Sequence, residues 1–165
     1  MKALVIAASA AVLALAVPAM AQAQDHQVYG SIGYANVSVD PISLGALQGR
    51  LGVNFNDHFG VEGEAAFGIS DDDILGIPVE LSSEFGLFGV VRLPVSENVD
   101  IFARGGWASA NFDVGGTEFD QDGGAYGAGV QVFFNESNGV RADYTRYEFD
   151  DSADVWSISF VHIFN

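Results

Sequence analysis

The stretch VELSSEFGLFGVVRL, residues 79–93, alternates between two kinds of side chain over its whole length. From Val79 onward every second residue is apolar or small, whereas the positions between them carry all the charge, at Glu80, Glu84 and Arg92. Because successive side chains of a β-strand point to opposite faces of a sheet, this period of two predicts a long strand with one apolar face.

The same alternation recurs along most of the chain. The predicted strands cover residues 27–37, 47–55, 59–69, 79–93, 99–111, 124–134, 139–149 and 155–164. Residues that favour turns separate them. Short connections are expected at 56–58, 94–98 and 135–138, long acidic ones at 38–46, 70–78 and 112–123, and one of intermediate length at 150–154. Short connections on one side and long ones on the other are typical of an up-and-down transmembrane barrel, and an even strand number places both chain ends on the periplasmic side.

The face that points outward decides the class of barrel. A soluble barrel has a water-facing outer surface rich in charges of both signs. Here one face is almost free of charge, as at Leu51, Val53 and Phe55, and the other carries small residues with a few isolated charges. An uncharged face suits hydrocarbon. We therefore predict an all-β fold, an eight-stranded antiparallel up-and-down transmembrane β-barrel; the alternative is a soluble periplasmic ligand-binding barrel.

The composition of the 165 residues excludes several classes of function. The chain has 22 acidic and 6 basic residues and a formal charge of −16, so nucleic acid is not an expected partner. It has no cysteine, which excludes disulfides and thiolate metal sites. We predict no cofactor and no structural metal.

The first residues have the features of an export signal. Lys2 precedes an apolar run from Ala3 to Val17, which is too short for a spanning helix. Small-residue cleavage patterns end at Ala21 and Ala23. We expect residues 1–23 to be a cleaved signal peptide and 24–165 to be the barrel domain, with the outer membrane of a Gram-negative bacterium as its destination.

Four stretches carry a family resemblance: VYGSIGYANV (28–37), FGVEGEAAFG (59–68), PVSENVDIFARGGWA (94–108) and YGAGVQVFFNESNGVRADY (126–144). Together they resemble the small OmpA-type eight-stranded outer-membrane barrel family. The resemblance implies an integral outer-membrane protein in which Glu62, Arg104, Arg141 and Asp143 point inward.

The inward charges predict an ion-pair network in the lumen. Counting from the turns places Arg50 opposite Glu64 and Arg92 opposite Asp100, with the other inward charges at comparable heights. The predicted network comprises Arg50, Glu62, Glu64, Arg92, Asp100, Arg104, Arg141 and Asp143. An eight-stranded interior is just filled by side chains, so the network is expected to plug the lumen; an ion gate or narrow channel is the alternative.

Acidic runs mark the expected long connections. The candidates for weak Ca²⁺ or Mg²⁺ binding are Asp71, Asp72, Asp73, Glu118, Asp120 and Asp122. The last three resemble the start of an EF-hand loop, but Gly129 stands where the bidentate Glu is required. A solvated acidic surface is the alternative. Arg146 either reaches a lipid phosphate or pairs with an acid such as Glu148.

No constellation of catalytic residues is visible. Ser159 and His162 lie close in sequence but on opposite faces of their strand, and neither His26 nor His58 supplies a partner. We therefore expect no enzyme. The leading function is a structural or surface-interaction role in the outer membrane, and the runner-up is a porin-like channel for small solutes or ions. The expected partners are outer-membrane lipid and lipopolysaccharide and, through the alternating C-terminal strand 155–164, the barrel assembly machinery; a monomer is expected.

Overall fold

The computed structural model describes residues 26–39, 42–69, 72–74 and 77–164. Its strands are β1 (Gln27–Val39), β2 (Ile42–Asn54), β3 (Phe59–Gly68), β4 (Asp72–Ile74), β5 (Ile77–Pro94), β6 (Val99–Val114), β7 (Thr117–Phe133), β8 (Asn138–Glu148) and β9 (Ala153–Phe164). No helix within these residues has the length and apolarity needed to cross a bilayer. The predicted signal peptide lies outside the described residues.

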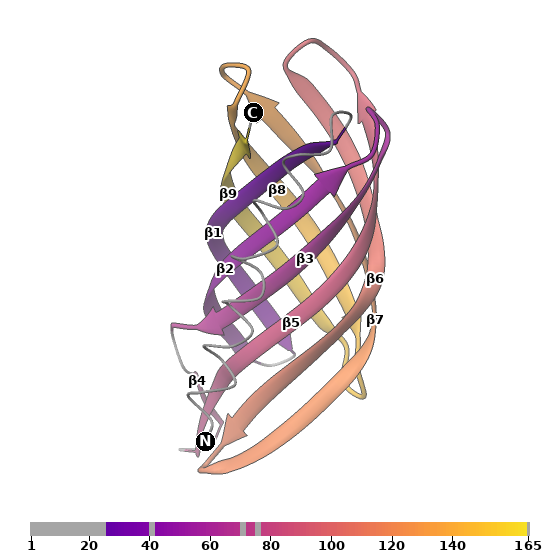
Figure 1. Ribbon diagram of the computed structural model, residues 1–165. Coiled ribbons are helices and arrows are strands. Elements are labelled where there is room, and N and C mark those ends of the chain that lie inside the picture. Colours follow the sequence, from indigo (N-terminus) through magenta and orange to yellow (C-terminus); the bar gives the residue numbers. More distant parts are fainter. Residues whose placement is uncertain (1–25, 40–41, 70–71, 75–76, 165) are drawn as a thin grey trace.

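The long strands close on themselves as an antiparallel barrel (Figure 1). Neighbours in the sheet follow the order β3-β2-β1-β9-β8-β7-β6-β5-β4, and a further pairing of β3 with β5 closes the ring. The three-residue β4 only forms a hairpin with the start of β5, so eight strands make the wall. Val28 pairs with Phe164, which places the start of β1 and the end of β9 at one end of the barrel, here called the terminal end; the opposite end is the far end. The predicted eight-stranded barrel is confirmed.

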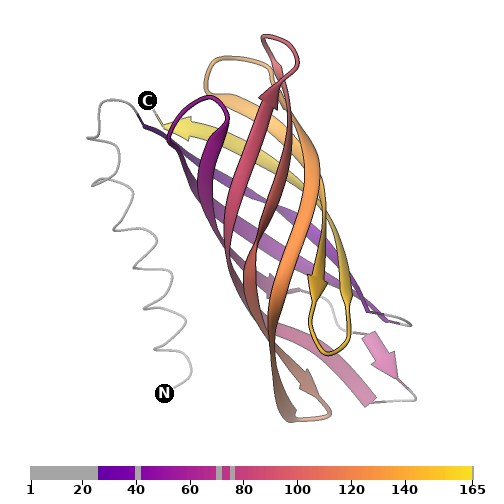
Figure 2. The ribbon, with the colours of Figure 1, turned by 90° about the vertical axis from the view of Figure 1, so that its right-hand side faces the viewer.

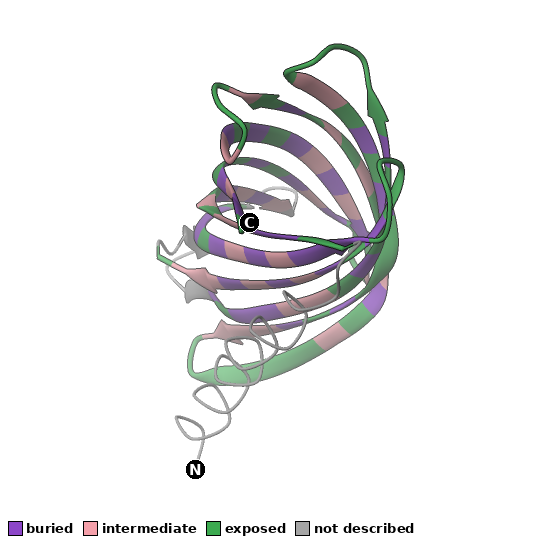
Figure 3. Ribbon diagram, turned by 45° about the horizontal axis from the view of Figure 1, so that its top comes forward, coloured by how far each residue is buried: buried purple, intermediate pink, exposed green. Residues whose placement is uncertain are grey.

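Burial alternates along the strands as the sequence pattern predicts (Figure 3). On β8 every second residue from Gly139 to Tyr147 is buried, because those positions face the lumen. One irregularity lies in the stretch that best showed the pattern. A bulge between Leu81 and Ser83 leaves Ser82 exposed and buries both of its neighbours. The expected unbroken alternation over 79–93 is therefore wrong at this point, since a bulge places an extra residue on one strand.

Two of the three expected long connections are strands instead. β1 and β2 approach so closely that only residues 40–41 separate them, and β6 and β7 are joined by Gly115 and Gly116 alone. These glycines have φ of 60° and 86°, which suits the tight turn that matches the twist of a hairpin. The connection between β3 and β5 holds β4. The prediction of long loops at 38–46 and 112–123 was wrong, because turn-forming and acidic residues in these segments continue the ladder.

The short turns at the terminal end are confirmed and have a local cause. The side-chain oxygen of Asn56 accepts hydrogen bonds from the backbone N–H groups of His58 and Phe59, both at 2.8 Å. Asn135 does the same for Ser137 at 3.0 Å and Asn138 at 2.8 Å. Asparagine stabilises such turns because its side chain replaces a backbone acceptor.

One pair of adjacent glycines shows how closely neighbouring strands of the wall approach each other. A Cβ on Gly106 would lie 1.9 Å from the carbonyl oxygen of Leu87 on β5, whereas a Cβ on Gly105 would have its nearest atom, the backbone oxygen of Ala125, 3.9 Å away. Close approach of two backbones at a strand bend requires glycine, so Gly106 lets β6 coil against β5.

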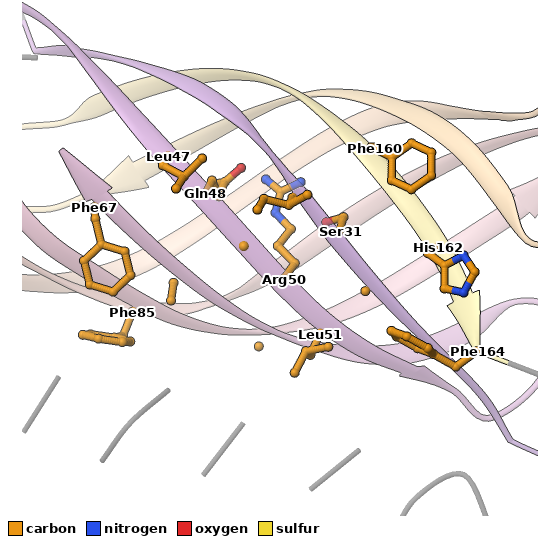
Figure 4. Close-up of a pocket in the computed structure, with 15 residues that line it drawn as sticks. Ser31, Leu47, Gln48, Arg50, Leu51, Phe67, Phe85, Phe160, His162 and Phe164 are labelled. Atoms are coloured by element: carbon orange, nitrogen blue, oxygen red, sulfur yellow. The ribbon is translucent and has the colours of Figure 1, made fainter. Parts of the chain in front are cut away.

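The outer face of the barrel is apolar. Leu87 is 67% exposed and Trp156 is 64% exposed, although both are large hydrophobic residues. Figure 4 shows part of this face, a pocket where Leu47, Leu51, Phe67, Phe85, Phe160 and Phe164 surround small residues of β2 and β3. An apolar surface of this extent is unfavourable in water and suits hydrocarbon.

Aromatic side chains mark both edges of that apolar band. Towards the terminal end lie Phe55, Phe59, Phe134, Phe160 and Phe164. Towards the far end lie Trp107, Tyr126, Tyr144 and Trp156, here called the far-end belt. Aromatic girdles at both interfaces are typical of membrane barrels, because the rings favour the headgroup level.

Candidate functional site

Six charged side chains meet in the middle of the lumen and form the lumen charge layer. Its members are Arg50, Glu62, Glu64, Arg104, Arg141 and Asp143, which come from β2, β3, β6 and β8. None is more than 4% exposed. Strand alternation places each of them inward, and barrel closure brings together strands that are far apart in sequence. The layer holds equal numbers of cations and anions.

Arg50 connects strands on two sides of the barrel. It lies directly opposite Glu64 in the β2–β3 register, as the sequence predicted, and its Nε donates to that carboxylate. Its Nη1 and Nη2 donate to the two oxygens of Asp143 on β8, at 2.6 and 2.9 Å. Ser157 donates a further hydrogen bond to Asp143 at 2.9 Å. A planar guanidinium can hold a carboxylate by two parallel bonds, which fixes both side chains.

Glu62 is the acceptor at the centre of the layer. Arg104 Nη1 lies 2.8 Å from its Oε1, and Arg141 Nη1 lies 2.6 Å from its Oε2. The hydroxyl of Tyr29 donates to Oε2 at 2.8 Å. Neighbouring Glu64 is held by Arg104 Nη2 at 2.7 Å and by the hydroxyl of Tyr147 at 2.5 Å. Each carboxylate thus has several charge-assisted partners, as a buried charge requires.

Aromatic rings support two of the cations from the remaining side. The guanidinium of Arg104 lies 3.7 Å from the ring centroid of Phe88, and that of Arg141 lies 4.0 Å from that of Phe102. A guanidinium over a ring face is stabilised by the ring quadrupole. The sequence analysis did not include these rings, although both lie on the polar face of their predicted strands.

Arg92 and Asp100 lie apart from the charge layer, at the terminal mouth. The expected direct opposition is wrong: Arg92 pairs in register with Phe102, and Asp100 with Pro94. The two charges are diagonal neighbours whose closest atoms are 3.9 Å apart. They line an open hollow of about 370 Å³, together with residues such as Asn54. The predicted network is therefore a six-residue layer and a separate, looser pair that lies nearer the terminal end.

Between the charge layer and the far end, the lumen holds an apolar core that the sequence analysis did not predict. Its buried members are Ala35, Val37, Leu44, Ala46, Ala66, Leu81, Phe88, Ala108, Ala110, Ala125, Tyr147, Ala153 and Val155. The sequence analysis placed small residues on the inward face, and Ala66, Ala108, Ala110 and Ala125 are among them. It did not predict that they pack with larger apolar side chains, such as Leu44 and Leu81, into one core.

Glu84 is the exception within this apolar region. Its side chain is buried, and its Oε1 has no hydrogen-bond partner among the described residues. In the β3–β5 and β5–β6 registers it lies opposite Ala66 and Ala110, which offer no charge. Glu84 is thus an inward carboxylate that the balanced layer does not neutralise.

The acidic candidates for cation binding lie on strands where the structure describes them. Glu118, Asp120 and Asp122 lie on β7, exposed and on one face, rather than in a loop. Asp72 and Asp73 lie on β4, and Asp71 is outside the described residues. Among the residues that the structure describes, no group of three or more acidic or histidine side chains is placed to hold a metal ion.

Arg146 lies on the outer face beside the far-end belt. Its Nε is 2.9 Å from Glu148 and its Nη1 is 3.0 Å from Asp154, so the structure shows the pairing with rim acids. The hydroxyl of Tyr144 also donates to Asp154, at 2.6 Å. This exposed cluster keeps the arginine at the level where apolar wall gives way to polar rim.

The nucleophile and base candidates stay separated. Ser159 is buried in the lumen, whereas His162 faces outward and its Nδ1 contacts the amide oxygen of Asn138 at 2.8 Å. The strand alternation of β9 therefore keeps these two side chains on opposite sides of the wall.

Comparison with known proteins agrees with this geometry. The family model described as outer membrane protein beta-barrel domain matches residues 7–164. A search of curated protein sequences finds no match. Similar solved structures include the outer membrane protein OprG from Pseudomonas aeruginosa, with a TM-score of 0.63 and 13% identity over 86% of this chain and 96% of that one.

Two further barrels show the same fold. Ail, the attachment invasion locus protein of Yersinia pestis, solved in complex with the heparin analogue sucrose octasulfate, has a TM-score of 0.60 and 17% identity over 84% of this chain and 97% of that one. Neisserial surface protein A has a TM-score of 0.58 and 14% identity over 86% and 98% of the two chains. At such identities the likeness establishes the fold alone.

The apolar outer face and the matched family model exclude the soluble alternative. The chain belongs to the outer membrane protein beta-barrel family and is an integral protein of the Gram-negative outer membrane.

Proposed function

We propose that this barrel has a structural or surface-interaction role and that its lumen is closed to ions and solutes. The observation that carries the proposal is the lumen charge layer, in which Arg50 and Arg141 reach across the interior to carboxylates on other strands. The apolar core between the layer and the far end supports the proposal, because its packed side chains form a second obstruction along the barrel axis.

The proposed role also implies an orientation of the protein in the membrane. We propose that residues 1–23 are removed on export and that the terminal end faces the periplasm, so that the far end faces outward. Lipid and lipopolysaccharide surround the apolar wall, and β9, with outward Trp156 and Phe164, is the strand offered to the barrel assembly machinery. We propose a monomer without cofactor and assign it no catalytic role.

Planar-bilayer recording of the refolded protein tests the closed lumen. The wild type should open rarely, since its interior is filled. Arg104→Ala removes a long side chain from between Glu62 and Glu64, and brief cation-selective openings should appear because the vacated space is lined by carboxylates. Arg146→Ala is the matched control, since it removes an arginine from the outer face.

The channel alternative makes a different prediction for the same recordings. Steady openings of the wild type, altered in selectivity by Arg104→Ala but not created by it, would reject the plug and support a porin-like passage.

A further inference from the structure

The mouth of the barrel at its terminal end contains the open hollow beside Arg92 and Asp100, here called the terminal hollow. Its volume is about 370 Å³, which lies within the range of small-molecule sites. The short turns and the end of β9 gather at this end of the barrel, which the label C marks in Figure 2. Towards the interior lies Tyr29, whose ring centroid is 5.3 Å from the guanidinium carbon of Arg92 and whose hydroxyl donates to Glu62. The terminal hollow therefore lies between the lumen charge layer and the solvent.

The guanidinium of Arg92 lines the terminal hollow and has no hydrogen-bond partner among the described residues. The residue is only 9% exposed, and its Nη1 lies 3.9 Å from Oδ2 of Asp100, too far for a hydrogen bond. The Asp100 carboxylate likewise accepts no hydrogen bond within the described part of the chain. Buried charges usually have charge-assisted hydrogen bonds, as those of the lumen charge layer do. Both charges are therefore free to bind a ligand in the hollow.

Two further carboxylates line the terminal hollow from the turns beside it. Asp57 lies in the turn between β2 and β3, Glu97 lies in the turn between β5 and β6, and both are exposed. The backbone N–H of Arg92 donates to the carbonyl oxygen of His58 at 2.7 Å, which ties the first of these turns to β5. With Asp100, three carboxylates thus surround one guanidinium. The excess of negative charge favours a ligand whose own net charge is positive.

Part of the terminal hollow is apolar. Phe133 and Ile163 line it, and they pack against one another in a small cluster inside the barrel. The polar side chains between them and the acids are held in place, since Asn54 Nδ2 donates to Gln27 Oε1 at 3.1 Å. A ligand that fills the hollow therefore has an apolar stem as well as charged ends.

We propose that the terminal hollow binds a free basic α-amino acid. Its α-carboxylate pairs with Arg92 and its α-ammonium pairs with Asp100, because these two side chains offer opposite charges at neighbouring points. Its aliphatic stem lies along the apolar side of the hollow, and its side-chain cation reaches Asp57 or Glu97 at the rim. The net charge of +1 on such a ligand complements the acidic site.

The proposed orientation supplies only the biological setting of this site, which is the periplasmic face. The ligand binds without passing through the barrel, because the lumen charge layer lies beyond Tyr29. Binding is measured by calorimetry and the closed lumen by conductance, so that failure of one proposal is distinguishable from failure of the other.

The experiment titrates the refolded barrel in neutral detergent with L-lysine and with three compounds that each lack one of its charges. Norleucine lacks the side-chain cation, Nα-acetyl-lysine lacks the α-ammonium, and 1,5-diaminopentane lacks the carboxylate. Each should bind at least about tenfold more weakly than lysine, the loss expected when a charge-assisted hydrogen bond disappears. No binding of lysine, or equal binding of 1,5-diaminopentane, would overturn the proposal, because the latter would show general attraction of cations to acids.

Variants locate the site. Arg92→Gln and Asp100→Asn should each weaken lysine binding at least about tenfold. Their controls are Arg146→Gln, on the outer face, and Asp151→Asn, an exposed acid at the far end, which change the net charge equally and should leave binding unchanged. Heat-dependent migration on a gel confirms that each variant is folded.

The rim provides a second test that leaves the buried pair intact. Asp57→Asn combined with Glu97→Gln should weaken the binding of lysine and leave that of norleucine unchanged, since norleucine has no cation to place at the rim. Equal weakening of both ligands, or weakening by the control variants, would contradict the assigned site.

Discussion

Arg141 on β8 and Glu62 on β3 hold each other across the lumen by two hydrogen bonds, from Nη1 at 2.6 Å and from Nη2 at 3.2 Å. These strands are not neighbours in the sheet, so the pair acts as a strut through the barrel interior. Glu62 also receives Arg104, which makes this one carboxylate the acceptor for cations from two other strands.

The first prediction concerns that carboxylate. Glu62→Gln should lower the free energy of unfolding by roughly 3–5 kcal/mol, because it leaves buried guanidinium groups without their counter-charge. Denaturant unfolding in lipid or detergent measures the change. Glu148→Gln is the control, since Glu148 pairs with Arg146 on the exposed rim and its loss should have a much smaller effect. Similar losses for the two variants would show that the layer is not a tight network.

Replacing Glu84 should change the free energy of unfolding in the opposite direction. It is buried in the apolar region with one oxygen unpaired, so Glu84→Met, which has a similar length and no group that needs a hydrogen bond, should raise the free energy of unfolding at neutral pH by about 1 kcal/mol, the scale of a buried unsatisfied group. The matched variant Glu64→Met should destabilise, because Glu64 forms an ion pair with Arg104 and accepts a hydrogen bond from Tyr147. A loss of stability in Glu84→Met would reveal a partner for this carboxylate.

Adjacent glycines of β6 provide a test of the wall. Gly106→Ala should cost roughly 1–3 kcal/mol or more, because its Cβ would collide with the Leu87 backbone 1.9 Å away. Gly105→Ala should change stability by less than about 0.5 kcal/mol, since the nearest atom is 3.9 Å away. Unfolding curves of the two variants, recorded side by side, compare a single methyl group on each face. Equal effects would contradict the assigned faces.

The depth of the outer face can be probed with arginine. Ala128 pairs with Ala103 in the apolar band, so Ala128→Arg should cost about 2–4 kcal/mol if it lies near the bilayer midplane. Ser109, opposite Asp122 at the far end, tolerates Ser109→Arg at a cost of about 0–1 kcal/mol. Stability measured in lipid vesicles distinguishes the two positions, and the reverse order would place the band elsewhere on the barrel.

The sequence by itself determined the eight long strands, their inward and outward faces and the pairing of Arg50 with Glu64 across a short turn. These features depend on local rules: a period of two sets the faces, and a turn of known length sets the register of the strands on either side. The asparagines at 56 and 135 mark such turns directly.

The tertiary structure decided what local rules leave open. Barrel closure sets which inward charges meet, so the contacts of Arg50 with Asp143 and of Arg141 with Glu62 have no local signature. The extension of β6 and β7 through acidic residues depends on pairing with a neighbour, and the bulge at Ser82 breaks a pattern that looks continuous in the sequence. Long-range pairing overrides local composition at these positions, because a backbone satisfied in a ladder outweighs the turn preference of single residues.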